Sequence, residues 1–244
     1  MHVKISVRNT AFFICTLFKL FLSGVAHAIR NLKQIDAGNG QVFGVNSADE
    51  IFTLYSGTWT RLSGSLKHVS VGPAGVWGVN ANNYIYRLDN GDWVPVNGQL
   101  KQVDAGGTVS PAGVNMFDDI YCLQGGQGAS WTNLPGKLKY YSCGPNSCWG
   151  VNSGNQIYIM KVRHYYGWEQ VPGSLSMIEV STDGKVYGVN SIGDMYTREG
   201  ITSANPTDTG WRQVQFGQKV KHVSYDLGHL WVIGTDNSIM DCTE

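Results

Sequence analysis

Short stretches in which apolar and polar residues alternate follow one another along most of the chain. In LKHVSVG, which begins at Leu66, successive residues fall on opposite faces, and this period of two is that of a β-strand rather than a helix. The segments VWGVN, YIYRL and WVPV come next, separated by ANN and DNGD, whose residues favour tight turns. The pattern therefore predicts four short strands within about 35 residues.

This four-strand unit is repeated along the chain. Its central phrase reads FGVNSADEIF from Phe43, GVWGVNANNYIY from Gly75 and YGVNSIGDMY from Tyr187. Each of six copies opens on an apolar residue, at Leu32, Leu66, Leu100, Leu138, Leu175 and Val220. Repeats of this length with four strands are typical of β-propeller blades, whereas a β-trefoil has three longer copies and a solenoid shorter ones. We therefore predict an all-β protein, a six-bladed β-propeller with four short strands per blade.

Two aromatic positions recur with the repeat, and we expect both to be packing positions because nearly every copy has them. The first set, in the expected outer strands, is Trp59, Trp93, Trp131, Trp168 and Trp211. The second set is Phe43, Trp77, Trp149, Tyr187 and Trp231, with Ala112 in the third copy. The first set has five members for six blades, so the outer strand of the sixth blade must come from one end of the chain.

The first 28 residues have the pattern of a secretory signal peptide. Lys4 and Arg8 precede an apolar stretch, and Ala26-His27-Ala28 fits a cleavage site. Lys19 interrupts the apolar stretch, and neither part approaches the roughly 20 residues that a membrane-spanning helix needs. We therefore predict a signal peptide at residues 1–28, a propeller at 29–244, secretion, and no membrane span.

The charge balance argues against some classes of partner. The chain has 18 Lys and Arg against 18 Asp and Glu, and removal of residues 1–28 takes away three cations and no acid, which leaves 15 − 18, or −3. Nucleic acids and anionic membranes are bound chiefly through clustered Lys and Arg. Neither is expected as the main partner.

The sequence gives little support for an enzyme, a metal or another cofactor. Zinc motifs of the H-x-x-H kind and the nucleophile elbow G-x-S-x-G are missing from it. His68 and His222 occupy the same repeat position, in Lys-His-Val-Ser, and are interpreted as structural. STDGKVYG, from Ser181, is a single mis-spaced echo of the Asp boxes of sialidases. LDNGDW, from Leu88, lacks the ligand spacing of a calcium loop and is interpreted as a tight turn.

If the repeats bind sugar, the residues needed are an aromatic face for the apolar side of a pyranose and short amides or carboxylates for its hydroxyls, and both types recur in the repeat. The candidate carbohydrate-binding residues lie where a strand meets an exposed turn: Asn46, Asp49, Asn80, Asn83, Asn115, Asp118, Asn152, Asn155, Asn190 and Asp194. The alternative is that each Asn only hydrogen-bonds the backbone of its own turn. Several similar sites on one rigid ring would gain avidity on a repetitive glycan.

The segments GSLKHVSVGPAGVWGVN, GKLKYYSCGPNSCWGVNS and HVSYDLGHLWV, together with the phrases between them, resemble the fish-egg lectins, which are secreted proteins built of tectonin repeats. The resemblance runs from residue 31 to 244. It implies a tectonin propeller that binds N-acetylglucosamine-type sugars and microbial surface glycans, such as lipopolysaccharide or peptidoglycan, in innate defence of egg or serum. Homo-oligomerisation stays open. The rival class is a protein-interaction scaffold, since tectonin propellers also occur inside cells.

The cysteines give separate expectations. Cys143 and Cys148 flank a Gly-Pro turn between two expected strands, so we predict a disulfide between them. The resemblance implies that an N-terminal strand with a Cys closes the ring, and no Cys would remain there after cleavage at Ala28. We therefore expect Cys242 and Cys122 to be unpaired. Alternatively, residues 1–30 are a variant first segment and the closing Cys lies in another.

Overall fold

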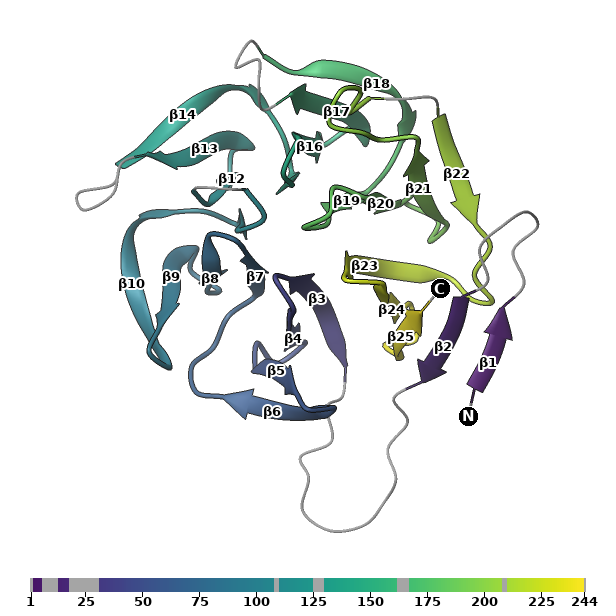
Figure 1. Ribbon diagram of the computed structural model, residues 1–244. Coiled ribbons are helices and arrows are strands. Elements are labelled where there is room, and N and C mark those ends of the chain that lie inside the picture. Colours follow the sequence, from purple (N-terminus) through teal and green to yellow (C-terminus); the bar gives the residue numbers. More distant parts are fainter. Residues whose placement is uncertain are drawn as a thin grey trace.

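The computed structural model describes residues 2–5, 13–17, 31–107, 110–124, 130–161, 167–207 and 210–243. These residues form strands and turns without a helix, and the strands make six antiparallel sheets arranged as blades around a central axis (Figure 1). The prediction of an all-β, six-bladed propeller is confirmed. In the described part of the chain there is accordingly no helix able to cross a membrane.

Five blades each consist of four consecutive strands, counted from the axis outward. Blade one is β3 (Leu32–Gly38), β4 (Gln41–Asn46), β5 (Ile51–Tyr55) and β6 (Thr58–Leu62). Blade two is β7 (His68–Gly72), β8 (Gly75–Val79), β9 (Tyr84–Asp89) and β10 (Asp92–Gln99). Blade three is β11 (Gln102–Asp104), β12 (Ala112–Val114), β13 (Asp119–Gln124) and β14 (Ser130–Lys137). Blade four is β15 (Tyr140–Cys143), β16 (Ser147–Val151), β17 (Gln156–Lys161) and β18 (Glu169–Ser174). Blade five is β19 (Met177–Val180), β20 (Val186–Val189), β21 (Met195–Glu199) and β22 (Gly210–Val214).

The sixth blade joins the two ends of the chain. Its inner strands are β23 (Val220–Asp226), β24 (His229–Gly234) and β25 (Ile239–Thr243), and β2 (Phe13–Leu17) then β1 (His2–Ile5) pair outside them (Figure 1). The expectation that an end of the chain supplies the outer strand is confirmed, and the N-terminal segment is the one that does so.

The core is divided among the blade interfaces. For example, one cluster joins Phe43, Val45 and Ile51 of blade one to Leu66 and Val69 of blade two. The recurring aromatic positions behave as predicted. Every member of the set that runs from Phe43 to Trp231 is at most 4% exposed, which confirms that this set is core.

The tryptophans of the outer strands seal the gaps between blades. Trp131 Nε1 of blade three donates to the carbonyl of Asn97 in blade two at 2.7 Å. A Cβ added to Gly98, which has φ of +114°, would lie only 2.8 Å from Trp131 Cδ1. Gly64, Gly136 and Gly173 meet Trp93, Trp168 and Trp211 in the same way. This explains why a Gly precedes the repeats that open at Leu66, Leu100, Leu138 and Leu175.

One cysteine expectation is wrong. Strand β2 pairs with β25 in the register Cys15↔Cys242, and a disulfide joins the two residues across 227 positions of sequence. Cys242 is therefore not free. The closing Cys lies inside the apolar stretch that was assigned to a signal peptide. The Ala26-His27-Ala28 motif lies outside the described residues, so cleavage there stays a prediction, and such cleavage would remove both β2 and the bridge.

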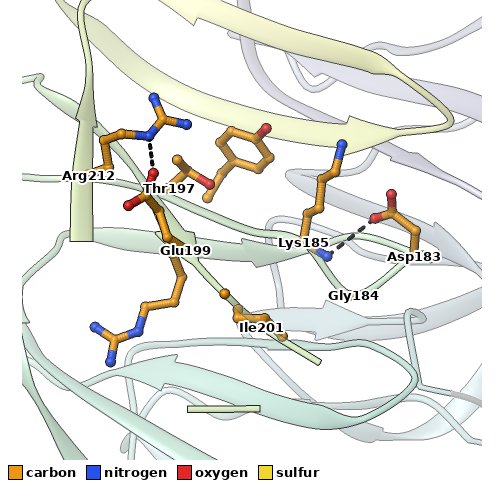
Figure 2. A pocket seen from close by; sticks show the side chains of 10 residues that line it. Asp183, Gly184, Lys185, Thr197, Glu199, Ile201 and Arg212 are labelled. Atoms are coloured by element: carbon orange, nitrogen blue, oxygen red, sulfur yellow. Dashed lines mark hydrogen bonds and ion pairs between the residues drawn. The ribbon is translucent and has the colours of Figure 1, made fainter. Parts of the chain in front are cut away.

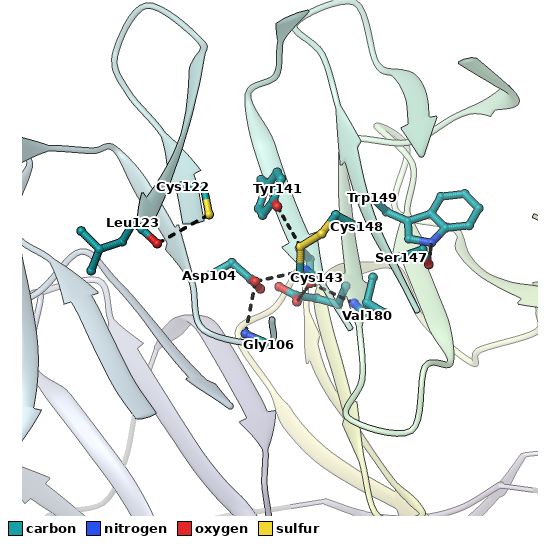
Figure 3. Close-up of a disulfide and its surroundings, with 12 residues drawn as sticks. Asp104, Gly106, Cys122, Leu123, Tyr141, Cys143, Ser147, Cys148, Trp149 and Val180 are labelled. Carbon is teal, nitrogen blue, oxygen red and sulfur yellow. Dashed lines mark hydrogen bonds between the residues drawn. A yellow bond between two sulfur atoms is a disulfide. The ribbon is translucent and has the colours of Figure 1, made fainter. Parts of the chain in front are cut away.

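The other cysteine expectations are confirmed. Cys143 and Cys148 face each other across β15 and β16 and form a disulfide (Figure 3). Cys122 is free and half-buried. It packs against the apolar cluster that contains Cys143 and Cys148, and burial raises the pKa of its thiol. The turn interpretation of LDNGDW is also confirmed, because Asp89 pairs with Asp92 and the two residues between them have positive φ.

Candidate functional site: the turn face of the propeller

All ten candidate residues lie at one end of the propeller, here called the turn face, which carries the turns between the second and third strands of the blades. In each turn the Asn side chain holds the backbone. Asn46 Oδ1 accepts the N–H groups of Ala48 and Glu50, both at 2.9 Å. The same pair of bonds recurs at Asn80, Asn115, Asn152 and Asn190. The side-chain amides of these asparagines therefore stabilise the backbone of their own turns, as the alternative interpretation predicted.

The fourth turn residue has a left-handed backbone and links one blade to the next. Asp49 has φ of +62° and Asn83 of +68°, a conformation that Asn and Asp tolerate better than other side chains. Their carbonyls accept the N–H groups that open the next repeat, Leu66 at 2.9 Å and Leu100 at 3.0 Å. Asp118 and Asn155 do the same. Backbone hydrogen bonds at the turn face therefore link each of the first four blades to the next one.

The fifth blade departs from the predicted alignment. Gly193 has the left-handed backbone there, with φ of +83°, and Asp194 lies one position further on. Asp194 Oδ1 accepts a hydrogen bond from Lys219 Nζ at 2.6 Å, which lowers the pKa of its carboxyl.

In blade six Asn237, with φ of +65°, occupies the fourth position of the turn. The prediction missed Asn237, although its place three residues after Gly234 matches the other copies.

A ring of lysines accompanies the turns. The Lys that follows the opening apolar residue of a repeat stands at a β-bulge, which Lys33 and Lys221 show directly because the register shifts around them. Each lysine Nζ donates to the fourth turn residue of its own blade: Lys33 to Asp49, Lys67 to Asn83, Lys101 to Asp118, Lys139 to Asn155 and Lys221 to Asn237. Blade five has Ser176 instead, whose hydroxyl donates to Val189. The sequence shows the Leu-Lys landmark, but not these partners.

Exposed apolar side chains lie on or beside the same face. Phe117 and Ile192, in the turns of blades three and five, are 72% and 66% exposed. Tyr84, which follows the turn of blade two, borders an open groove of about 590 Å³ with Tyr86, Pro95, Asn97 and Gln99. An aromatic ring beside side-chain amides is what a pyranose needs.

A second, more polar pocket of about 340 Å³ lies in blade five (Figure 2). It is lined by Lys185, Tyr187, Thr197, Glu199 and Arg212, among others. Arg212 Nε pairs with Glu199, and Lys185 Nζ donates to the hydroxyl of Tyr225 in blade six at 2.5 Å. The hairpin that carries Lys185 lies at the end of the blade opposite to the turn face. In the sequence, the only feature of this hairpin that stands out is its likeness to an Asp box, and this likeness did not predict the pocket.

The axis below the lysines is closed by side chains from alternate blades. Tyr140 Oη of blade four lies 3.0 Å from His222 Nε2 and 3.4 Å from His68 Nε2, and it donates to Glu179 at 2.5 Å. Burial lowers the pKa of both histidines to about 3, so they are neutral. The structural interpretation of His68 and His222 is supported by these contacts.

The next level of the axis carries buried carboxyls on blades one, three and five. Asp36 Oδ2 accepts the N–H of Val71 at 2.7 Å and Asp104 Oδ2 accepts that of Cys143 at 3.1 Å, each across a blade boundary. Burial raises the pKa of Asp36 to about 6, and burial with neighbouring carboxyls raises those of Asp104 and Glu179 well above their usual range. These carboxyls hold the inner strands together, so their perturbed pKa values need no catalytic role.

Comparison with known proteins shows the family to which the chain belongs. A model of the Tectonin domain matches residues 31–235. The Fish-egg lectin of Cyprinus carpio is 57% identical over 226 residues, covering 87% of this chain and 95% of that protein. The chain therefore belongs to the tectonin propellers, and within them to the fish-egg lectin family.

Solved structures share the fold at low identity. A gluconolactonase from Xanthomonas campestris superposes with a TM-score of 0.68 at 9% identity, covering 95% of this chain and 89% of its own. Virginiamycin B lyase from Staphylococcus aureus gives 0.59 at 15% identity, covering 87% and 79%. Although both are enzymes, identities this low show only a common propeller architecture.

Proposed function

We propose that this protein is a secreted, non-catalytic and multivalent lectin that binds N-acetylglucosamine-type sugars on microbial surfaces, including lipopolysaccharide or peptidoglycan, in innate defence. The observation that carries the proposal is the 57% identity to a fish-egg lectin over nearly its whole length. Two disulfides suit an oxidising, extracellular compartment.

The turn face is the proposed sugar-binding surface. Its turns repeat with nearly the same geometry, which supports several similar sites rather than one. We assign sugar contacts to the candidate turn residues and, in blade two, to the groove beside Tyr84. The Tyr84 ring would cover the apolar face of the pyranose, and Asn97 and Gln99 would bond its hydroxyls.

Retention on an N-acetylglucosamine resin, with elution by the free sugar, tests the proposal. Tyr84→Ala should weaken retention. Tyr55→Ala is the matched control, because Tyr55 is 77% exposed but is the last residue of β5, at the end of its blade opposite to the turn face. Failure of the unaltered protein to bind this resin and a panel of bacterial glycans would favour a protein-interaction scaffold.

A further inference from the structure

The five lysines that follow the opening apolar residues of their repeats fall into two electrostatic classes. Those of blades one and three, Lys33 and Lys101, donate to carboxylates. Those of blades two, four and six donate to neutral amides: Lys67 to Asn83, Lys139 to Asn155 and Lys221 to Asn237. A hydrogen bond to an amide satisfies a donor of the ammonium group but leaves its charge uncompensated.

The uncompensated charges therefore lie on blades two, four and six, which alternate around the axis (Figure 1). The end of the axis at the turn face, where the five lysines stand, is here called the lysine mouth. Burial is the first cause that lowers the pKa of Lys67, Lys139 and Lys221. For Lys67 the charges of Lys33 and Lys101 act in the same direction, and for Lys139 that of Lys101 does. The positive charges of these lysines therefore repel one another across blade boundaries.

Acidic groups on this face offset only part of that charge. Asp49 acts on Lys67, Asp118 on Lys139 and Asp236 on Lys221, each in the opposite direction. The remaining described acids of the turns have cations of their own: Glu50 pairs with Arg61, Asp119 with Lys137 and Asp194 with Lys219. The mouth is therefore positive although the whole chain has equal numbers of cations and acids.

The floor of the mouth is closed and polar. Tyr140, His68 and His222 meet on the axis one residue beyond the lysines of their blades. In the described structure the Nδ1 atoms of both histidines are buried and lack a hydrogen-bond partner. A ligand would thus rest on the mouth and not pass through the ring.

We propose that this lysine mouth is an anion site that takes a ligand with several phosphate groups; it adjoins the turn residues to which sugar contacts are assigned and is distinct from the groove beside Tyr84. Lysine binds phosphate as a point charge, and three such charges set around an axis favour a ligand whose phosphates reach more than one of them.

Substitutions that give one blade the lysine partner found in another blade test the proposal. Asn83→Asp, Asn155→Asp and Asn237→Asp together copy the pairing of blades one and three, and Asp49 and Asp118 show that Asp fits this left-handed position. The reverse pair, Asp49→Asn with Asp118→Asn, exposes two further ammonium charges. Circular dichroism of each variant establishes that the propeller is folded.

Calorimetric titration with inorganic tripolyphosphate, at about 20 mM and again at about 150 mM salt, measures the site. We expect saturable binding that weakens with salt, a loss of about tenfold or more in the triple Asp variant, and a gain of several-fold in the double Asn variant. Tyr84→Ala, which should weaken retention on the resin, should leave the affinity for tripolyphosphate unchanged, and this separates the result from that of the resin. Absence of saturable binding, or equal affinity in all three proteins, would overturn the proposal.

Discussion

Cys15 lies directly opposite Cys242 in the pairing of β2 with β25, and the disulfide between them ties the N-terminal strand to the last strand of the chain. Both residues are at most 2% exposed. The bond closes the ring within blade six, where the chain ends meet. Opening of the propeller at this seam therefore requires the loss of strand pairing and of a covalent link.

Cys242→Ser should lower the free energy of unfolding by roughly 2–5 kcal/mol, because the cross-link restrains a very long loop in the unfolded chain. Urea denaturation measures the change. Cys122→Ser is the control, since Cys122 is free, and its effect should stay below about 1.5 kcal/mol. Equal stability of the Cys242 variant and the unaltered protein would show that the bridge does not hold the ring.

Thiol counting gives an independent check on the same bridge. The full chain, folded under oxidising conditions, should have one reactive thiol, at Cys122. A chain that starts at residue 29 lacks Cys15 and should have two, at Cys122 and Cys242. One thiol in the shorter chain, or two in the full chain, would contradict the pairing described here.

The histidines of the axis predict an acid limb in the stability curve. Their pKa values are lowered to about 3 by burial, from an ordinary value of 6.5. Between these values the unfolded chain takes up protons on these histidines that the folded chain does not, so the histidine contribution to stability falls as the pH falls from 6.5 toward 3. The raised pKa values of Asp36, Asp104 and Glu179 act in the opposite direction, because these carboxyls take up protons in the folded chain first. Each histidine contributes at most about 1.4 kcal/mol per pH unit.

Replacement of both histidines by Gln should remove the histidine contribution, so that the variant loses less stability, or gains more, than the unaltered protein as the pH falls from 6.5. Gln34 and Gln102 occupy the equivalent position in blades one and three, where they bond the next blade, so Gln is accepted there. Chemical denaturation at pH 7, 6, 5 and 4 measures the slope. An unchanged slope in His68→Gln/His222→Gln would assign the acid sensitivity to other groups.

Gly98→Ala tests the packing between blades two and three. The added Cβ would meet Trp131 at 2.8 Å and 2.9 Å, and the backbone φ is +114°. We expect a loss of about 2–3 kcal/mol in urea. Gly91→Ala is the control, with φ of +91° and no atom within 4 Å of the new Cβ, and should cost about 1 kcal/mol. Equal losses would mean that the Trp contact adds nothing.

The propeller could be predicted from the sequence because its causes are local and repeated. The alternation around Leu66, the turn residues and the spacing of the Trp set each indicate a blade. Strand β2 was missed because FICTL, which buries Phe13 and Cys15, has the same apolar composition as a signal peptide. Composition alone does not distinguish these two fates of an apolar segment.

The candidate site could be predicted only in part. The Asn positions were found because they repeat, and their turn bonds follow from the ordinary chemistry of Asn. Each lysine meets its Asp or Asn partner within one blade, 16 or 17 positions away, and the Leu-Lys landmark does not indicate that contact. The meeting of Tyr140 with His68 and His222 depends on residues from separate blades. Such contacts exist only once the ring is closed.

The central claim is that the propeller presents several weak sugar sites, and calorimetric titration with free N-acetylglucosamine tests it most directly. We predict a stoichiometry above one sugar per chain and a dissociation constant in the range of about 0.1–10 mM, with much tighter apparent binding to intact bacterial surfaces through avidity. A stoichiometry of one with tight binding of the monosaccharide would contradict the claim of multiple weak sites. Absence of any heat of binding up to saturating sugar, together with no retention on bacterial surfaces, would contradict the lectin itself.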